Sequence, residues 1–366
     1  MLLQIKQFLR REAILCLAVF LACASSLFQA PRLAYIDFDV LCVLLSLMLV
    51  VAGLKQVLFL DYVAVELLNR CVSRRQLTLA LVGITYVSSM FVTNDVALLT
   101  FVPLALVIGK TLQLDMERSI ILQTLAANLG SMLTPPGNPQ NLFLYAHYNY
   151  TAGRFFCVMA LPCLLSLAYI GVLIFRRPDA PLTLTLPGLP RPERRTTLVL
   201  LALLLVNIAA VLHVLPKLWA LGVTLAAVLL LNRRLLLAAD YSLLLTFIGF
   251  FIFIGNISHT SIAAYLQGSL LGTATGTYLA ALLSSQFISN VPAAMLLAGL
   301  TQEADALLLG VNIGGLGTMI ASMASVISYK LFVAEQPTLA GRYLLTFLYY
   351  NFAGLLLIGG LVYCII

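Results

Sequence analysis

The stretch SSMFVTNDVALL at residues 88–99 recurs later in the chain as SSQFISNVPAAM at residues 284–295. In each copy an apolar run is broken by a short polar tip, Thr93-Asn94-Asp95 in the first and Ser289-Asn290 in the second. The copies agree at one constant offset of 196 residues: Ser88/Ser284, Ser89/Ser285, Phe91/Phe287, Thr93/Ser289 and Asn94/Asn290. The chain therefore contains an internal repeat, and each copy carries an interrupted apolar segment.

A second pair of motifs follows the first pair in the same order. NLGSMLT at residues 128–134 and NIGGLGT at 312–318 share the spacing N-x-G-x-x-x-T at a constant offset of 184 residues. The first motif runs into TPPGNPQN (134–141), which cannot be a continuous helix because its prolines remove backbone donors and clash with the preceding turn. Each half of the chain is thus predicted to carry two interrupted helical segments.

The composition excludes a water-soluble fold. Of 366 residues, 62% are hydrophobic and 10% are charged, whereas a soluble domain has about 25% charged residues. Apolar stretches of roughly 20 residues, the length needed to cross a bilayer, fill most of the chain. We therefore predict an integral membrane protein whose partner is the lipid bilayer, and we exclude a nucleic-acid binder. The seven scattered cysteines predict neither a disulfide framework nor a zinc site.

The predicted fold is an all-α polytopic membrane protein. It has two inverted-topology repeats, about nine crossings and two re-entrant hairpins with discontinuous helices. Residues 1–175 form the first repeat, with a cytoplasm-entering hairpin at 76–110. A linker and a connecting helix occupy 176–216. Residues 217–366 form the second, inverted repeat, with an outside-entering hairpin at 272–301.

Shorter segments flank the hairpins. The arms of the first hairpin, at 76–92 and 96–109, are predicted to be shorter than a comfortable span. An amphipathic piece precedes each hairpin, near 64–71 in the first repeat and near 262–266 in the second. Both pieces are predicted to be helices that lie along the membrane surface.

Basic residues set the predicted orientation. With the N-terminus in the cytoplasm, 18 of the 21 Lys and Arg residues fall inside, and only Arg32, Arg154 and Lys217 fall outside. This asymmetry is the one that the positive-inside rule requires. The C-terminus then ends outside, and the membrane is predicted to be a bacterial-type inner (plasma) membrane.

The breaks are predicted to converge near the bilayer midplane, where inverted repeats place their binding sites. Hydroxyl and amide groups there bind ligand oxygens, and glycines allow close backbone approach. The predicted site residues are Thr93, Asn94, Asp95, Asn128, Gly130, Thr134, Gly137, Asn138, Asn141, Ser289, Asn290, Asn312, Gly314 and Thr318. A Na⁺ ion is placed near Asn94, Asn128, Asn290 and Asn312.

Asp95 is the acidic residue that lies well inside an apolar segment, and intramembrane carboxylates are costly and usually functional. We predict that Asp95 carries the coupling ion, Na⁺ or H⁺. The alternative is that it caps the second hairpin arm from its N-terminus. Lys330 is predicted to lie near a cytoplasmic end, which leaves no Lys or Arg at midmembrane. An anion would then be held by amides, hydroxyls and helix N-termini.

These motifs resemble those of the ion transporter superfamily that includes divalent anion:sodium symporters, arsenite pumps and NhaD-type sodium/proton antiporters. The hairpin-tip Ser-Asn-Thr signature of that superfamily falls on Thr93-Asn94-Asp95 and on Ser289-Asn290-Val291. Asp95 and Val291 stand where dicarboxylate carriers have a third hydroxyl, and an Asn-Asp tip is similar to that of arsenite pumps.

The loop TPPGNPQN resembles the TPxGxPxN loop of the symporters, whereas Thr318-Met319-Ile320 lacks the proline pair, which predicts a different or incomplete second ion site. The resemblance implies a homodimer with a scaffold and a mobile transport region, moving like an elevator and coupled to Na⁺ or H⁺.

We therefore predict an ion-coupled secondary transporter of a small anion or oxyacid, such as a dicarboxylate, an inorganic anion or arsenite, with no cofactor. The alternative within transport is a sodium/proton antiporter. A channel is disfavoured because no ring-type selectivity filter is visible. A membrane-embedded enzyme is disfavoured because the sequence has no H-E-x-x-H or G-x-S-x-G motif and Asp95 has no acid/base partner.

Overall fold

The computed structural model describes residues 12–176, 178–258 and 260–366. This part of the chain contains 17 α-helices and no β-strand element, which confirms the all-α prediction. Some of the basic residues that set the predicted orientation lie outside the described residues, namely Lys6, Arg10, Arg11 and Arg177.

The helices of the first repeat follow the predicted order. They are α2 (Ala13–Ser26), α3 (Phe38–Gln56), α4 (Phe59–Leu68), α5 (Arg74–Val92), α6 (Asn94–Leu112), α7 (Glu117–Ser131), α8 (Pro139–His147) and α9 (Ala152–Phe175). A 3₁₀ turn, η2 (Pro135–Gly137), separates α7 from α8, where the prolines predict a break.

The second half repeats this order after the linker. It comprises α10 (Arg194–Val211), α11 (Lys217–Asn232), α12 (Tyr241–Ile257), α13 (Ser261–Ser269), α14 (Ala274–Ile288), α15 (Asn290–Ala298), α16 (Ala304–Ile313), α17 (Met323–Glu335) and α18 (Ala340–Tyr363). The 3₁₀ turn η4 (Met319–Ala321) separates α16 from α17. It lies 184 residues after η2, so both repeats break their helix at the same place even though the second lacks the proline pair.

Among the described residues, 7 helices are long and apolar enough to cross a membrane. They include both arms of the first hairpin, because α5 and α6 have 19 residues each. The prediction of short arms at 76–92 and 96–109 was therefore wrong. Helix α5 begins two residues earlier, capped by the Ser73 side chain, and α6 continues through Pro103 to Leu112. The second hairpin has short arms, of 15 and 9 residues.

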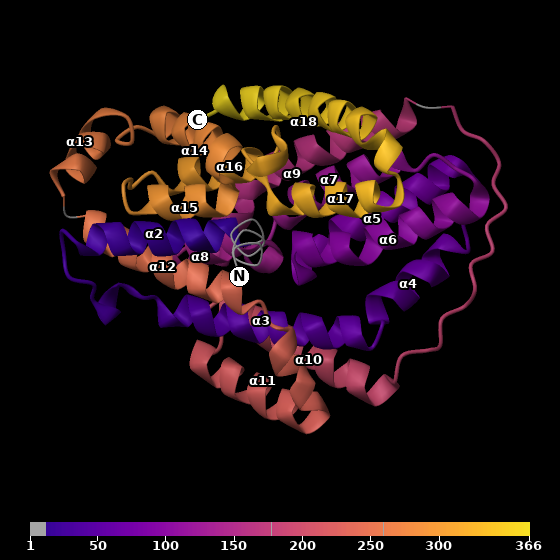
Figure 1. The fold of residues 1–366 in the computed structure, drawn as a ribbon, viewed down its shortest axis with the longest axis horizontal. Coiled ribbons are helices and arrows are strands. Elements are labelled where there is room, and N and C mark those ends of the chain that lie inside the picture. The colour runs from indigo at the N-terminus through magenta and orange to yellow at the C-terminus, as the bar shows by residue number, and fades with distance from the viewer. Residues whose placement is uncertain (1–11, 177, 259) are drawn as a thin grey trace, which may run out of the picture.

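The two repeats pack against each other reciprocally. Within the repeats, α5 packs on α7 and α14 packs on α16. Between the repeats, α2 packs on α12 as α11 packs on α3, and α17 packs on α6 as α8 packs on α15. Figure 1 shows α10 and α11 at one edge and α18 at the opposite edge, with the broken helices between them. This exchange of partners is what two interlocked inverted repeats produce.

The linker between the repeats is an extended chain docked on the junction of α4 and α5. Ser73 forms an isolated antiparallel bridge with Pro181, and the Leu186 backbone N–H donates to Asn69 Oδ1 at 2.8 Å. The Arg75 backbone N–H donates to Asp179 Oδ1 at 3.0 Å and holds the pKa of that carboxyl below its usual value. The linker thus has a fixed course despite its lack of helical periodicity.

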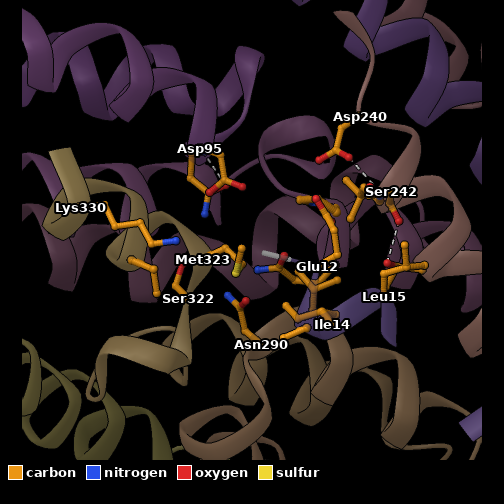
Figure 2. A pocket seen from close by; sticks show the side chains of 18 residues that line it. Glu12, Ile14, Leu15, Asp95, Asp240, Ser242, Asn290, Ser322, Met323 and Lys330 are labelled. Carbon is orange, nitrogen blue, oxygen red and sulfur yellow. Dashed lines mark hydrogen bonds between the residues drawn. The ribbon is translucent and has the colours of Figure 1, made fainter. Parts of the chain in front are cut away.

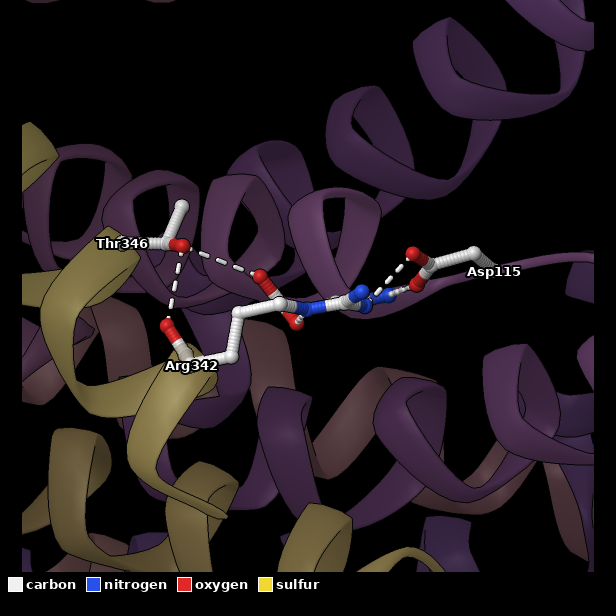
Figure 3. Close-up of polar contacts among 4 residues, drawn as sticks. Asp115, Arg342 and Thr346 are labelled. Atoms are coloured by element: carbon white, nitrogen blue, oxygen red, sulfur yellow. Dashed lines mark hydrogen bonds and ion pairs between the residues drawn. The ribbon is translucent and has the colours of Figure 1, made fainter. Parts of the chain in front are cut away.

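Ion pairs join helices of the two repeats near their first turns. Arg342 on α18 binds Glu117 at the start of α7, and its Nη2 lies 2.6 Å from Asp115 Oδ2 (Figure 3). Thr346 Oγ1 also donates to Glu117 Oε1 at 3.0 Å. Glu117 is buried, so this cluster supplies the ionic and hydrogen-bonding partners that a buried carboxylate needs.

The equivalent pair lies at the opposite end of the molecule. Arg154 in the first turn of α9 binds Asp305 in the first turn of α16 at 3.1 Å, just as Arg342 in the first turn of α18 binds the start of α7. Lys217 binds Asp39 at 3.3 Å. The repeats therefore place matching arginine contacts at opposite ends.

Candidate functional site

Both hairpin tips have the same unusual backbone. Thr93 has φ 74° and ψ 154°, and its counterpart Ser289 has φ 74° and ψ 153°. This region is populated almost only by glycine, and a side chain there costs about 1–3 kcal/mol. The kink ends α5 and α14 and starts α6 and α15 at Asn94 and Asn290, both of which are buried. Thr93 and Ser289 thus set the backbone geometry of the two tips.

The threonines of the two N-x-G-x-x-x-T motifs fasten the loops to the hairpins. Thr134 Oγ1 donates to the Met90 carbonyl at 2.5 Å, and Thr318 Oγ1 donates to the Gln286 carbonyl at 2.8 Å. Met90 and Gln286 are counterparts at the offset of 196 residues. Both threonines were predicted to line the site; in the structure they lie behind the cavity described below.

The motif glycines allow helices to touch. A Cβ at Gly130 would lie 2.4 Å from the Tyr86 carbonyl oxygen, and a Cβ at Gly314 would lie 2.9 Å from Ser285 Oγ. A Cβ at Gly137 would lie 2.1 Å from a carbonyl oxygen of Ser131. These positions exclude any larger residue unless the backbone moves, and they serve packing behind the site.

Asn128 on α7 contacts the other repeat. Its Oδ1 accepts hydrogen bonds from Asn94 Nδ2 at 3.2 Å and from Ser322 Oγ at 2.9 Å, and its Nδ2 donates to Ser325 Oγ at 3.3 Å. Ser322 and Ser325 lie at the start of α17, the broken helix of the second repeat. Asn128 thus links the first hairpin tip to the second broken helix.

Asn312 on α16 makes the reciprocal contact. Its Oδ1 accepts from Asn138 Nδ2 at 3.2 Å, and its Nδ2 donates to Asn141 Oδ1 at 2.6 Å. Asn138 also caps α8 by accepting the Asn141 backbone N–H at 2.9 Å. Asn138 and Asn141 are the counterparts of Ser322 and Ser325 at the offset of 184 residues. Each asparagine therefore joins its own repeat to the broken helix of the other repeat, through equivalent contacts.

A cavity of about 200 Å³ lies in front of this network. Its lining includes Asn94, Asp95 and Asn290 from the hairpin tips (Figure 2). It also includes the first residues of α8 and α17, and those of α2 and α12, which are neighbours in the fold. Six helices therefore begin at the cavity: α2, α6, α8, α12, α15 and α17.

Among the described residues, four charged side chains line the cavity: Glu12, Asp95, Asp240 and Lys330. Asp95 Oδ1 is buried and has no hydrogen-bond partner within the described part of the chain. Figure 2 shows Asp240 across the cavity from Asp95, while Lys330 points into the cavity from α17. Lys330 joins the cavity lining because α17 begins at the cavity and carries this residue two turns later on the same face.

Of the predicted site residues, three reach the cavity: Asn94, Asp95 and Asn290. The others form the hydrogen-bonded and close-packed wall behind it. The amides of Asn128 and Asn312 are engaged by protein groups, and the two residues are connected through Ser131 and Asn138. In the described residues, no group of three or more His, Cys, Asp or Glu side chains is placed to hold a metal ion.

Sequence reasoning missed Glu12, Asp240 and Lys330. Asp240 caps α12 by accepting the Leu243 N–H, as Asp37 caps α3 by accepting the Val40 N–H. This capping pattern was visible in the sequence, but the packing of α12 beside the hairpin tips was not. For Lys330, the spacing of Met323, Val326 and Lys330 at i, i+3 and i+7 was the available signal.

A family model described as "CitMHS: Citrate transporter" matches residues 1–328. The chain belongs to the CitMHS citrate transporter family. It is 31% identical over 314 residues to the inner membrane protein YbiR of Escherichia coli K12, covering 81% of each chain. It is 32% identical over 333 residues to the uncharacterized transporter MJ0456 of Methanocaldococcus jannaschii, covering 90% of this chain and 86% of that one.

A solved structure, that of the Alcanivorax borkumensis YdaH transporter, is similar to 88% of this chain and 84% of its own, with 15% identity and a TM-score of 0.46. The CitMHS match and the relatives agree that the chain is a membrane transporter, whose substrate is a small molecule or ion. It is not an enzyme.

Proposed function

We propose that this CitMHS protein is an ion-coupled secondary transporter of a small anion or oxyacid, and that Asp95 binds the coupling ion. The observation that carries the proposal is the Asp95 carboxylate, which faces a cavity bounded by six helix N-termini and has a buried oxygen without a hydrogen-bond partner among the described residues. The family description makes citrate the first substrate to test.

The helix N-termini support an anionic substrate. Each N-terminus presents unpaired backbone N–H groups and the positive end of a helix dipole. Here α6, α8, α15 and α17 bring such ends to one cavity from four separate breaks. An anion that binds between them gains favourable interactions from several directions at once.

The acidic residues support coupling to a cation. Asp95 and Asp240 face the same cavity, and two like charges in a confined space repel each other. A proton or a Na⁺ ion relieves that repulsion, after which the site accommodates an anion more readily. Binding of the coupling ion and of the anion would therefore favour each other.

The asymmetry between repeat-related walls supports alternating access. Leu243 and Thr246 on α12 and Val326 and Lys330 on α17 line the large cavity. Their counterparts Val40, Val43, Leu142 and Ala146, on α3 and α8, line a pocket of only about 10 Å³. The same pair of surfaces is therefore open on one side of the molecule and closed on the other. Exchanging the two arrangements would open the site to the opposite side.

The closed side is held by polar and aromatic contacts. The Lys217–Asp39 ion pair lies at the small pocket, where the rings of Tyr145 and His213 stack with centroids 5.2 Å apart. An elevator-like motion would carry the hairpins and α7, α8, α16 and α17 past α2, α3, α11 and α12. The homodimer, the inner-membrane location and a cytoplasmic N-terminus belong to the same proposal.

The proposal is tested by thermal unfolding of purified protein with Na⁺, Li⁺, a pH series, citrate, other dicarboxylates, sulfate, phosphate and arsenite. A ligand that binds only the folded state raises stability by mass action. We expect Na⁺ or a pH step to stabilise the wild type and Asp95→Asn to abolish that response. Glu66→Gln, which removes an exposed carboxylate on α4, is the control. An unchanged response in Asp95→Asn contradicts the role of Asp95.

A sodium/proton antiporter is the second candidate function, favoured by the three carboxylates on the cavity wall. In that case Asp95 would exchange Na⁺ and H⁺ directly, and Na⁺ or Li⁺ would stabilise the protein while no anion does. Exchange of Na⁺ for H⁺ by proteoliposomes without any added organic or inorganic oxyanion would favour this function over anion transport.

A further inference from the structure

Lys330 is the basic residue that lines the cavity within the described part of the chain. Its position on α17 continues the face formed by Met323 and Val326, so the lysine projects to the cavity and not into the protein core. Figure 2 shows its ammonium group pointing toward the space between Asp95 and Ser322. Lys330 is exposed and not buried, so its charge is accessible from the cavity. A basic residue that faces a cavity in a membrane protein marks a candidate functional position.

The Lys330 ammonium has no partner among the residues that the structure describes. Among the described residues, no ion pair or hydrogen bond engages it, in contrast to Lys217, Arg154 and Arg342, which are all paired. The counterpart of Lys330 in the first repeat is Ala146. The fold of the repeat therefore does not require a charge at this position. The large cavity has a lysine here, whereas the small pocket has an alanine at the equivalent position.

Asn290 is a second unpartnered group at the same cavity. It is only 5% exposed, yet its side-chain amide makes no hydrogen bond to any described residue. The equivalent amide of Asn94 is fully engaged: its Nδ2 donates to Asn128 and its Oδ1 accepts the Asp95 N–H. Because Asn290 lines the cavity, its amide is accessible there and can donate a hydrogen bond to a ligand.

The backbone of the second motif positions the Asn290 amide. A Cβ at Gly315 would lie 3.0 Å from Asn290 Nδ2, so the absence of a side chain there leaves room for the amide. The counterpart of Gly315 in the first repeat is Ser131. The second tip is thus shaped differently from the first, and its asparagine is free to face a ligand.

From these observations we infer that Lys330 and Asn290 form an anion subsite that binds an oxyanion group of the substrate. The inference rests on the proposed function. The Lys330 ammonium donates a charged hydrogen bond to one oxygen of the group, and Asn290 Nδ2 donates to another. A carboxylate and a tetrahedral oxyanion both present two such oxygens. Asp95 and Asp240, which line the same cavity, hold the coupling ion.

The test is the uptake of radiolabelled citrate by proteoliposomes, with sulfate, phosphate and succinate as competitors. Lys330→Met keeps most of the side-chain volume but removes the charge, and we expect it to raise the citrate KM by about tenfold or more, the loss typical of a charged hydrogen bond. Lys330→Arg restores part of this loss. Lys110→Met, which removes a charge at the far end of α6, leaves the KM unchanged. Competition by succinate alone indicates a carboxylate subsite, and competition by sulfate or phosphate indicates a tetrahedral one.

A second variant covers the case in which Lys330→Met does not fold. Gly315→Ala places a methyl group against the Asn290 amide, and we expect it to raise the KM for the same anions while Asp95-dependent coupling persists. If both Lys330→Met and Gly315→Ala have the KM of the wild type, the proposed anion subsite is wrong, but the proposal of anion transport is not contradicted. Failure of the wild type to take up or be inhibited by any anion overturns the proposed function itself.

Discussion

Asn128 and Asn312 occupy the same position in the two repeats, and each is hydrogen-bonded to the broken helix of the opposite repeat. Asn128 contacts Ser322 and Ser325 on α17, and Asn312 contacts Asn138 and Asn141 on α8. The repeats are therefore joined through polar side chains directly behind the cavity. A rearrangement that preserved these bonds would move both broken helices together as one unit.

Removing one of these asparagines should destabilise the protein. Asn312→Ala removes the donor to Asn141 Oδ1 and one of the two acceptors of Asn138 Nδ2. The buried Asn141 Oδ1 then has no donor, and we expect a loss of about 1–3 kcal/mol. Asn128→Ala should have a similar effect. Thermal unfolding in detergent measures it, and a double-mutant cycle of Asn312→Ala with Asn138→Ala isolates the coupling. Additive losses in that cycle would show that the contact contributes nothing.

Glycine at the first hairpin tip should stabilise the protein. Thr93 has a positive φ that costs about 1–3 kcal/mol for a side chain and that glycine adopts freely. We therefore expect a higher Tm for Thr93→Gly than for wild type. Thr93→Ala is the matched control, because it keeps the Cβ and gains nothing. An equal Tm for the two variants would contradict a strained tip.

The two arginine contacts should differ in their contribution to stability. Glu117 has a side chain only 3% exposed, so Arg342→Met leaves a buried charge unpaired and should cost about 3 kcal/mol or more. In the Arg154–Asp305 pair both side chains are well exposed, and Arg154→Met should cost less than about 1 kcal/mol. Adding Glu117→Gln to Arg342→Met should recover part of the loss. Equal losses in the two arginine variants would contradict this account of burial.

Cysteine pairs should trap the two arrangements proposed for alternating access. In a background without the seven native cysteines, Val40→Cys with Leu142→Cys should be bridged by a short bifunctional reagent in the described state, because both residues line the small pocket. Leu243→Cys with Val326→Cys should be bridged only after the protein changes to the opposite state. Each bridge should stop uptake, and its reduction should restore it.

A control for the cysteine pairs comes from the substrate. Adding a coupling ion and an anion together should change the ratio of the two cross-linked products. A ligand that binds one of the two arrangements more tightly raises the population of that arrangement. If the pair on α12 and α17 never forms a bridge under any condition, the repeat-related surfaces do not exchange and the proposed alternation is wrong.

The repeat and its breaks were predictable because they depend on local chemistry. Helix breaks coincide with the polar tips at Thr93 and Ser289 and with the cluster of prolines after Thr134. A single proline such as Pro103 lies inside a helix. The arm lengths were predicted less well, because Arg74 and Lys110 are charged and still belong to α5 and α6. Charged residues predict the ends of membrane segments in a sequence, but these helices continue past them to their capping residues.

The contents of the cavity were only partly predictable. Asn94, Asp95 and Asn290 follow from the motifs, because a helix break in a membrane must face protein or a cavity. Asp240 and Lys330 depend on which helices pack beside the tips, and that packing joins α12 and α17 to segments far away in the sequence. Thr134 and Thr318 were assigned to the site lining because the sequence does not show which way a hydroxyl points.

The most direct test of the central claim, ion-coupled transport of an anion, is citrate uptake by proteoliposomes under an imposed Na⁺ or H⁺ gradient. The account predicts accumulation above the external concentration, its collapse when an ionophore dissipates the gradient, and its loss in Asp95→Asn. Uptake that only reaches the external concentration, is indifferent to the ionophore and persists in Asp95→Asn would contradict it.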